Sequence, residues 1–99
     1  MWIAVISCGG FAGATEDLGS LDTAMAGEAR RQQIEGIVQA VDFFHLPSDI
    51  PDASASADRF RYEITISDDS VQHSVSFQDT DSPSPVTEQL LRLRDAVTG

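Results

Sequence analysis

Two neighbouring stretches in the second half of the chain alternate between apolar and polar residues, and they constrain the fold more than any other feature. The stretches are residues 60–67 and 71–78. Every second residue is apolar, with the exception of one histidine, and these positions are Phe60, Tyr62, Ile64, Ile66, Val71, His73, Val75 and Phe77. Successive side chains of a strand point to opposite faces of a sheet, so each stretch predicts a strand with one buried and one solvated face. The polar residues 68–70 between them predict the turn of a β-hairpin.

The beginning of the chain predicts a second hairpin. Residues 1–7 are rich in β-branched and aromatic side chains and are followed by the glycine-rich residues 9–13, which is typical of a strand that runs into a loop. A return strand over residues 14–21 is the shortest connection after that loop.

Apolar residues at helical spacing predict a long helix in the middle of the chain. They are Ile34, Ile37, Val38, Val41 and Phe44. Asp22 or Thr23 can cap the first free amides of this helix. We expect the helix to begin between Ala24 and Gly27 and to run to Phe44.

A shorter helix is predicted at the end of the chain. Ser84 is a typical N-cap residue, and Pro85 suits the first helical position because a backbone N–H there would have no partner within the helix. The apolar stripe of this helix consists of Val86, Leu90, Leu93 and Val97.

The order strand, strand, helix, strand, strand, helix predicts an α+β fold, in which helices pack on an antiparallel sheet. A chain of 99 residues is too short for two independent cores, so we expect a single domain over residues 1–99. A flexible loop at about residues 46–58 and a short linker at about 79–84 connect its elements. The connectivity places residues 9–13 and the start of the 46–58 loop at the same end of the domain.

The charge of the chain excludes several classes of partner. Six Arg, no Lys and sixteen acidic residues give a formal net charge of −10. Nucleic acids and anionic membranes require clusters of Lys and Arg, so neither is an expected partner. Residues 1–6 lack the features of a signal peptide, which predicts a cytoplasmic protein, with non-classical export as an alternative. We expect self-repulsion to keep the free protein monomeric.

Side chains that carry catalysis or bind metals are few. Cys8 is the single cysteine, and the two histidines are His45 and His73. His73 falls in the core-facing register of its strand, and no cation lies near Cys8 in the sequence to activate a thiolate. Two histidines are too few for most zinc sites. We therefore expect no enzymatic activity, no cofactor and no metal site in the chain itself.

The first candidate binding segment is a glycine-bracketed aromatic loop. It consists of Gly9, Gly10, Phe11, Ala12 and Gly13. Phe11 either folds back onto the core or is exposed for a partner to cover. The glycine spacing matches no phosphate-binding fingerprint, so an anionic ligand is not predicted.

The second candidate segment is the proline-punctuated acidic stretch within the 46–58 loop. Its candidate binding residues are Leu46, Asp49, Ile50 and Asp52. The carboxylates are either solvated charges or groups that meet a partner. Their spacing does not match an EF-hand, so an intrinsic calcium site is not predicted.

Three short motifs follow one another along the chain. They are Gly9-Gly10-Phe11-Ala12-Gly13, Asp42-Phe43-Phe44-His45-Leu46-Pro47 and Asp58-Arg59-Phe60-Arg61-Tyr62. In this order the chain resembles the emfourin family, small bacterial inhibitors of thermolysin-family (protealysin-like) zinc metalloproteases. Cys8 departs from the serine expected before the glycine pair, and this departure bears on the choice of target.

The resemblance implies that two adjacent loops block the active-site cleft of such a protease. The protease zinc keeps an open position that a carboxylate can occupy. Asp49 or Asp52 is implied to approach that zinc, with Glu16 and Asp17 in reserve, whereas Asp58 is assigned to the start of its strand.

An apolar side chain of the inhibitor is implied to fill the substrate pocket beside the protease zinc. Phe11, Leu46 and Ile50 are the candidates. The alternative function is a non-enzymatic acidic interaction module that has no protease target, in which the acidic surface docks a basic partner.

Overall fold

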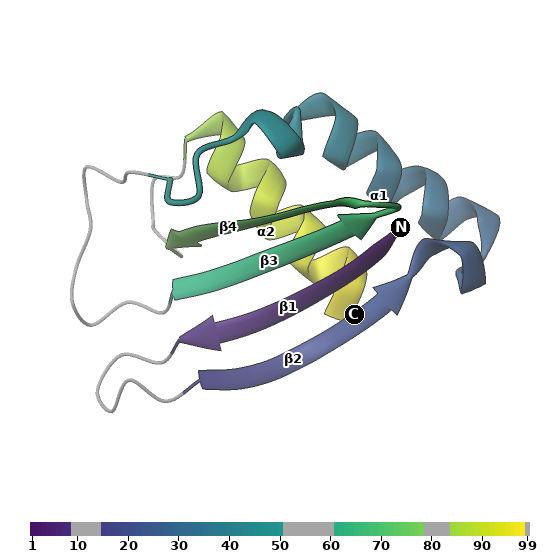
Figure 1. Ribbon diagram of the computed structural model, residues 1–99, viewed down its shortest axis with the longest axis horizontal. Coiled ribbons are helices and arrows are strands. Elements are labelled where there is room, and N and C mark those ends of the chain that lie inside the picture. The colour runs from purple at the N-terminus through teal and green to yellow at the C-terminus, as the bar shows by residue number, and fades with distance from the viewer. Residues whose placement is uncertain (9–14, 51–60, 79–83, 99) are drawn as a thin grey trace.

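The computed structural model describes residues 1–8, 15–50, 61–78 and 84–98 of the chain. Its elements are β1 (Trp2–Cys8), β2 (Thr15–Asp22), the 3₁₀ turn η1 (Thr23–Met25), α1 (Glu28–Ala40), the 3₁₀ turn η2 (Phe43–His45), β3 (Arg61–Asp68), β4 (Val71–Gln78) and α2 (Pro85–Thr98). The strands form one antiparallel sheet in the order β2-β1-β3-β4, and both helices lie on the same side of it (Figure 1). The predicted α+β fold and its order of elements are confirmed.

The strand register defines two ends of the sheet. Cys8 pairs with Thr15 on one side and with Arg61 on the other, and Arg61 pairs with Gln78. We call this row of four residues the Cys8 end. The turn between β3 and β4 lies at the opposite end, which we call the hairpin end (Figure 1).

The face of the sheet beneath the helices carries the hydrophobic core. Its side chains that are 0% exposed are Ile3, Val5, Ile64, Ile66, Val75 and Phe77. Ile34 of α1 and Leu90 and Leu93 of α2 are buried to the same degree. The alternation within residues 61–78 therefore places Ile64, Ile66, Val75 and Phe77 in the core as predicted, and apolar burial holds the layers together. The prediction is wrong at the two ends of β4, where Val71 is 52% exposed and Gln78 is 7% exposed.

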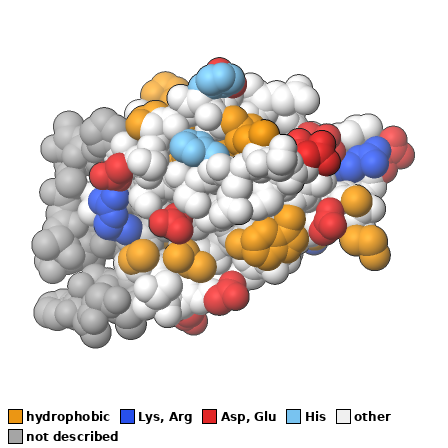
Figure 2. Space-filling model, in the orientation of Figure 1, with side chains coloured by type: hydrophobic (Ala, Val, Ile, Leu, Met, Phe, Trp, Pro, Cys, Tyr) orange, Lys and Arg blue, Asp and Glu red, His pale blue; other side chains and the backbone are white. Residues whose placement is uncertain are grey.

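The other face of the sheet is open, since both described helices lie behind it. On this face the hydroxyls of Thr65 and Ser74 are hydrogen bonded across β3 and β4 at 2.8 Å. Trp2, at the start of β1, is 45% exposed. Figure 2 looks onto this face and shows hydrophobic side chains along its middle, with acidic side chains around them.

The central helix begins just after the predicted interval. α1 starts at Glu28 with Gly27 as its N-cap, and no side chain caps it. The Asp22 carboxylate instead accepts a hydrogen bond of 3.0 Å from the Ala24 N–H and so caps η1. The predicted cap by Asp22 or Thr23 therefore serves the short turn before the helix, and the expectation that it caps the helix is wrong.

The same helix ends earlier than its periodicity predicts. Its last residue is Ala40, and Asp42 adopts a left-handed backbone with a φ of 54°. This conformation interrupts helical hydrogen bonding and redirects the residues that follow. As a result Phe43 is the buried aromatic at 1% exposure, whereas Phe44 is only half-buried. The prediction that the helix runs to Phe44 is wrong.

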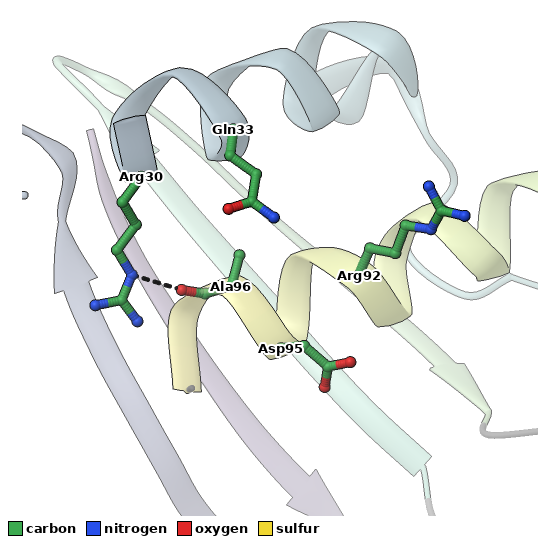
Figure 3. Close-up of a pocket in the computed structure, with 5 residues that line it drawn as sticks. All are labelled: Arg30, Gln33, Arg92, Asp95 and Ala96. Atoms are coloured by element: carbon green, nitrogen blue, oxygen red, sulfur yellow. Dashed lines mark hydrogen bonds between the residues drawn. The ribbon is translucent and has the colours of Figure 1, made fainter. Parts of the chain in front are cut away.

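The terminal helix confirms its prediction and is tied to α1. The Ser84 hydroxyl accepts the Thr87 N–H at 3.2 Å, as expected of an N-cap. At the other end of α2, the Arg30 guanidinium donates to the carbonyls of Ala96 and Val97 at 2.8 and 3.3 Å. Figure 3 shows the first of these bonds between the two helices. The last carbonyls of a helix have no partner within it, so Arg30 caps α2 from outside.

Candidate functional site

The described residues on both sides of residues 9–14, and the one that follows residues 51–60, lie at the Cys8 end. Cys8 and Thr15 border residues 9–14 and pair with each other, and Cys8 also pairs with Arg61, which borders residues 51–60. Gly9, Gly10, Phe11, Ala12, Gly13, Asp52 and Asp58 lie outside the described residues. The site is therefore built from the strand ends and from residues 46–50.

Residues 48–50 run along the outer edge of β4. The Ser76 N–H donates to the Ser48 carbonyl at 2.8 Å, and the Ile50 N–H donates to the Ser76 carbonyl at 2.9 Å. Asp49 lies between these two bonds and forms a parallel bridge with Ser76. The backbone on both sides of Asp49 is thus fixed by strand-type hydrogen bonds, within a segment for which the sequence predicts a flexible loop.

The Asp49 carboxylate is held at the surface by a cation. It forms an ion pair with the Arg61 guanidinium, and the side chains of Asp49 and Arg61 are 67% and 40% exposed. Exposed ion pairs stabilise proteins by roughly 0–1 kcal/mol. A stronger ligand for the carboxylate can therefore displace Arg61 at small cost.

Leu46 and Ile50 anchor the same segment to the core. Both side chains are half-buried and pack against the core cluster. The Leu46 carbonyl lies 2.6 Å from Nε2 of His73, and the His73 ring meets Phe43 edge-on with centroids 5.7 Å apart. A carbonyl can only accept, so Nε2 of His73 carries the donated hydrogen. His73 therefore holds the first residue of the segment in place. Because His73 pairs with Ile66, two residues from the β3–β4 turn, the 46–58 loop starts nearer the hairpin end and reaches the Cys8 end only along β4. The expectation that this loop starts at the same end as residues 9–13 is wrong.

Glu16 and Asp17, the alternative candidates for the carboxylate that approaches the zinc, lie at the start of β2. Glu16 and Asp17 are both exposed, and the Asp17 carboxylate accepts the Gly19 N–H at 3.0 Å. The pairing of β1 with β2 shifts by one residue at this point, and Gly19 has a φ of 147° that a residue with a side chain rarely adopts. The Asp17 side chain thus supports a β-bulge beside the Cys8 end.

The described residues bring together neither a thiol–imidazole pair nor a metal cluster. The Cys8 side chain lies on the open face of the sheet, because Cys8 is an even number of residues from Trp2 on β1. His73 pairs with the buried Ile66 and lies on the covered face. His45 is exposed, and its Nδ1 lies 2.7 Å from an Asp42 carboxylate oxygen. Within the described part of the chain, no three His, Cys, Asp or Glu residues are placed to hold a metal ion.

None of the helices in the described part of the chain is long and apolar enough to cross a membrane.

Arg61 is the member of this site that the sequence did not predict. Its position in the alternating stretch places it on the solvated face of β3, and that placement is correct. Its ion pair with Asp49 depends on the hydrogen bonds that bring residue 49 beside β4. Such a long-range contact leaves no local signal in either segment, because spacing patterns report only on contacts along one element.

Comparison with known families supports the resemblance seen in the three motifs. The family model Emfourin matches residues 5–94, a span that runs from β1 into α2 and includes both borders of each candidate segment. No curated protein and no solved structure matches the chain.

Proposed function

The chain belongs to the emfourin family, and from this premise we propose that it inhibits a thermolysin-family zinc metalloprotease by inserting the Cys8 end into the active-site cleft. The family is one of inhibitors and not of enzymes. The observation that carries the proposal is the family match over residues 5–94.

An aspartate of the inhibitor, Asp49 or Asp52, approaches the protease zinc in this proposal. A zinc ion held by two histidines and a glutamate has an open position, and a carboxylate oxygen ligates it at about 2.0–2.2 Å in place of the catalytic water. The geometry of Asp49 supports its candidacy, because its carboxylate is exposed and its backbone is already hydrogen bonded to β4. Less conformational entropy is then lost when the complex forms.

The ion pair with Arg61 is compatible with this role. Releasing the Asp49 carboxylate costs at most about 1 kcal/mol, since both side chains are substantially exposed. A metal–carboxylate bond in a water-excluded cleft can offset that cost. Arg61 therefore orients Asp49 in the free protein and is replaced by zinc in the complex.

An apolar side chain fills the substrate pocket beside the zinc in the same proposal. Leu46 and Ile50 are half-buried against the core, so using either of them as a wedge would expose core surface. Phe11 lies outside the described residues, and because of the cost at Leu46 and Ile50 we propose it for the pocket ahead of them. The net charge of −10 accelerates encounter with a metal-bearing cleft more than it deepens affinity.

A titration of protease activity tests the function. A thermolysin-family protease at fixed concentration is mixed with increasing amounts of the chain, and hydrolysis of a chromogenic peptide is followed. We expect a linear loss of activity that reaches zero near one equivalent and is not restored by added zinc. No loss at excess chain would favour the acidic interaction module, and recovery with zinc would reveal chelation; either result contradicts the proposal.

Substitutions of the two aspartates test the metal-directed part separately. We expect Asp49→Ala or Asp52→Ala to weaken inhibition roughly 100-fold or more, because removing one partner of a desolvated charge contact costs several kcal/mol. Asp95→Ala is the matched control, since Asp95 is 66% exposed and paired with Arg94 on α2. If Asp49→Ala and Asp52→Ala both inhibited as well as Asp95→Ala, the metal-directed part would be wrong.

A further inference from the structure

A hollow of about 430 Å³ lies at the hairpin end of the molecule, away from the proposed inhibitory site. Its lining residues are Phe44 of η2 and Asp68, Asp69, Ser70 and Val71 of the β3–β4 turn. Asp68 is seven positions along β3 from Arg61, which corresponds to roughly 23 Å of strand. The hollow is therefore separate from Arg61 and the carboxylate of Asp49, whereas Leu46 lies close to it.

Two apolar side chains form the wall of the hollow. Val71 is 52% exposed, which is unusual for a β-branched residue on the core-facing parity of its strand. Phe44 packs edge-on against the buried Phe43, with ring centroids 5.9 Å apart. The Phe44 part of the apolar surface is thus held against the core before any ligand arrives, so this ring needs little ordering when one binds.

The rim of the hollow is acidic. Asp68 and Asp69 are both exposed, and Asp69 has a left-handed backbone with a φ of 53° at the tip of the turn. Neither carboxylate forms an ion pair with any residue in the described ranges. Among the described residues, no cation neutralises these two charges.

This combination selects one class of ligand. A purely apolar group would desolvate two carboxylates without a partner for them, which is unfavourable. A second copy of the chain would bring another net charge of −10 to the same place. An arginine or lysine side chain matches both features, because its aliphatic stem covers apolar surface while its charged head meets the carboxylates.

We propose that the hollow lined by Phe44, Asp68, Asp69 and Val71 docks an arginine or lysine side chain of a basic partner segment. The stem lies against Phe44 and Val71, and the head lies between the two carboxylates. The hollow and the Cys8 end are at opposite ends of the sheet, so a side chain in the hollow does not occupy the position of the Asp49–Arg61 pair. This inference does not depend on the proposed inhibition.

Nuclear magnetic resonance with small probes tests the inference on the full chain. The ¹⁵N-labelled protein is titrated with N-acetyl-arginine amide, with the isosteric but uncharged N-acetyl-citrulline amide, and with guanidinium chloride, which has the charge without the stem. We expect saturable shifts of the Ser70 and Val71 amides with the arginine probe, and binding weaker by about fivefold or more with each of the others. Equal binding of citrulline, or shifts that avoid these amides, would overturn the proposal.

Substitutions locate the site. Asp68→Asn and Asp69→Asn together keep the shape of the turn, because asparagine tolerates the left-handed backbone, and should weaken arginine binding about fivefold or more. Val71→Thr removes apolar surface while keeping a β-branched side chain and should weaken binding less. Asp95→Asn on α2 is the control and should bind like the wild type. Undiminished binding by the double variant would overturn the proposal.

Discussion

The two faces of the sheet differ in what they contribute to the molecule. Beneath the helices, Ile64, Val75 and Phe77 are 0% exposed and belong to one continuous core. On the open face the same strands carry hydroxyl and charged side chains, of which Thr65 and Ser74 are hydrogen bonded to each other. Stability is therefore concentrated on one face, and residues at the ends of the sheet can be substituted for function without unfolding the domain.

The largest effect on stability should come from the covered face. Phe77→Ala removes a fully buried ring from β4. We expect the free energy of unfolding to fall by about 3–5 kcal/mol through lost burial and the cavity left behind. Chemical denaturation followed by circular dichroism measures this change, and a loss below about 1 kcal/mol would remove the contrast between the two faces.

A smaller effect is expected where the covered face meets residues 46–50. His73→Phe keeps the aromatic contact with Phe43 but removes the hydrogen bond to the Leu46 carbonyl. We expect a destabilisation of about 1–2 kcal/mol, since a half-buried carbonyl loses its donor.

The same variant should also weaken protease inhibition, because residues 46–50 lose an anchor and Asp49 is less well presented. The inhibition constant and the denaturation midpoint are measured on the same preparation. Full inhibition by a destabilised variant would show that the placement of Asp49 does not depend on His73.

Helix capping should contribute less than core burial. Ser84→Ala removes the side-chain acceptor for the Thr87 N–H at the start of α2. We expect a loss of about 1 kcal/mol. Ser84→Asp preserves an acceptor and serves as the control, so equal denaturation midpoints for the two variants would contradict the capping role.

The smallest effect is expected on the open face. Thr65→Val keeps the shape and β-branching of the side chain but removes its hydroxyl contact with Ser74. We expect a change of about 0.5 kcal/mol or less, because the Ser74 hydroxyl remains accessible to water. A loss as large as that of Phe77→Ala would break the comparison of the two faces.

The sequence predicts the sheet and the terminal helix well, because both depend on local patterns. Alternation identified the β3–β4 hairpin, and the Ser84-Pro85 pair identified the start of α2. The end of α1 was mispredicted because Asp42 adopts a left-handed conformation that its residue type permits but does not require. Phe44 fell on the helical period by coincidence, and Phe43 enters the core instead.

The candidate site was predicted less completely than the fold. The sequence singled out Leu46, Asp49 and Ile50 as one segment. Its connectivity placed the start of that segment near the end of β1, whereas Leu46 lies beside His73, nearer the hairpin end. The strand-type bonds to Ser76 and the ion pair with Arg61 were not predicted, since both join residues that are far apart in the sequence. Contacts of this kind follow from the register of the whole sheet and not from any local motif.

The affinity of the chain for one protease with and without its zinc tests the account most directly. If Asp49 or Asp52 ligates the metal, the zinc-free protease should bind the wild-type chain at least about tenfold more weakly, a difference of about 1.4 kcal/mol. The Asp49→Ala, Asp52→Ala double variant should bind both forms of the protease equally. Equal affinity of the wild-type chain for both forms would contradict the account.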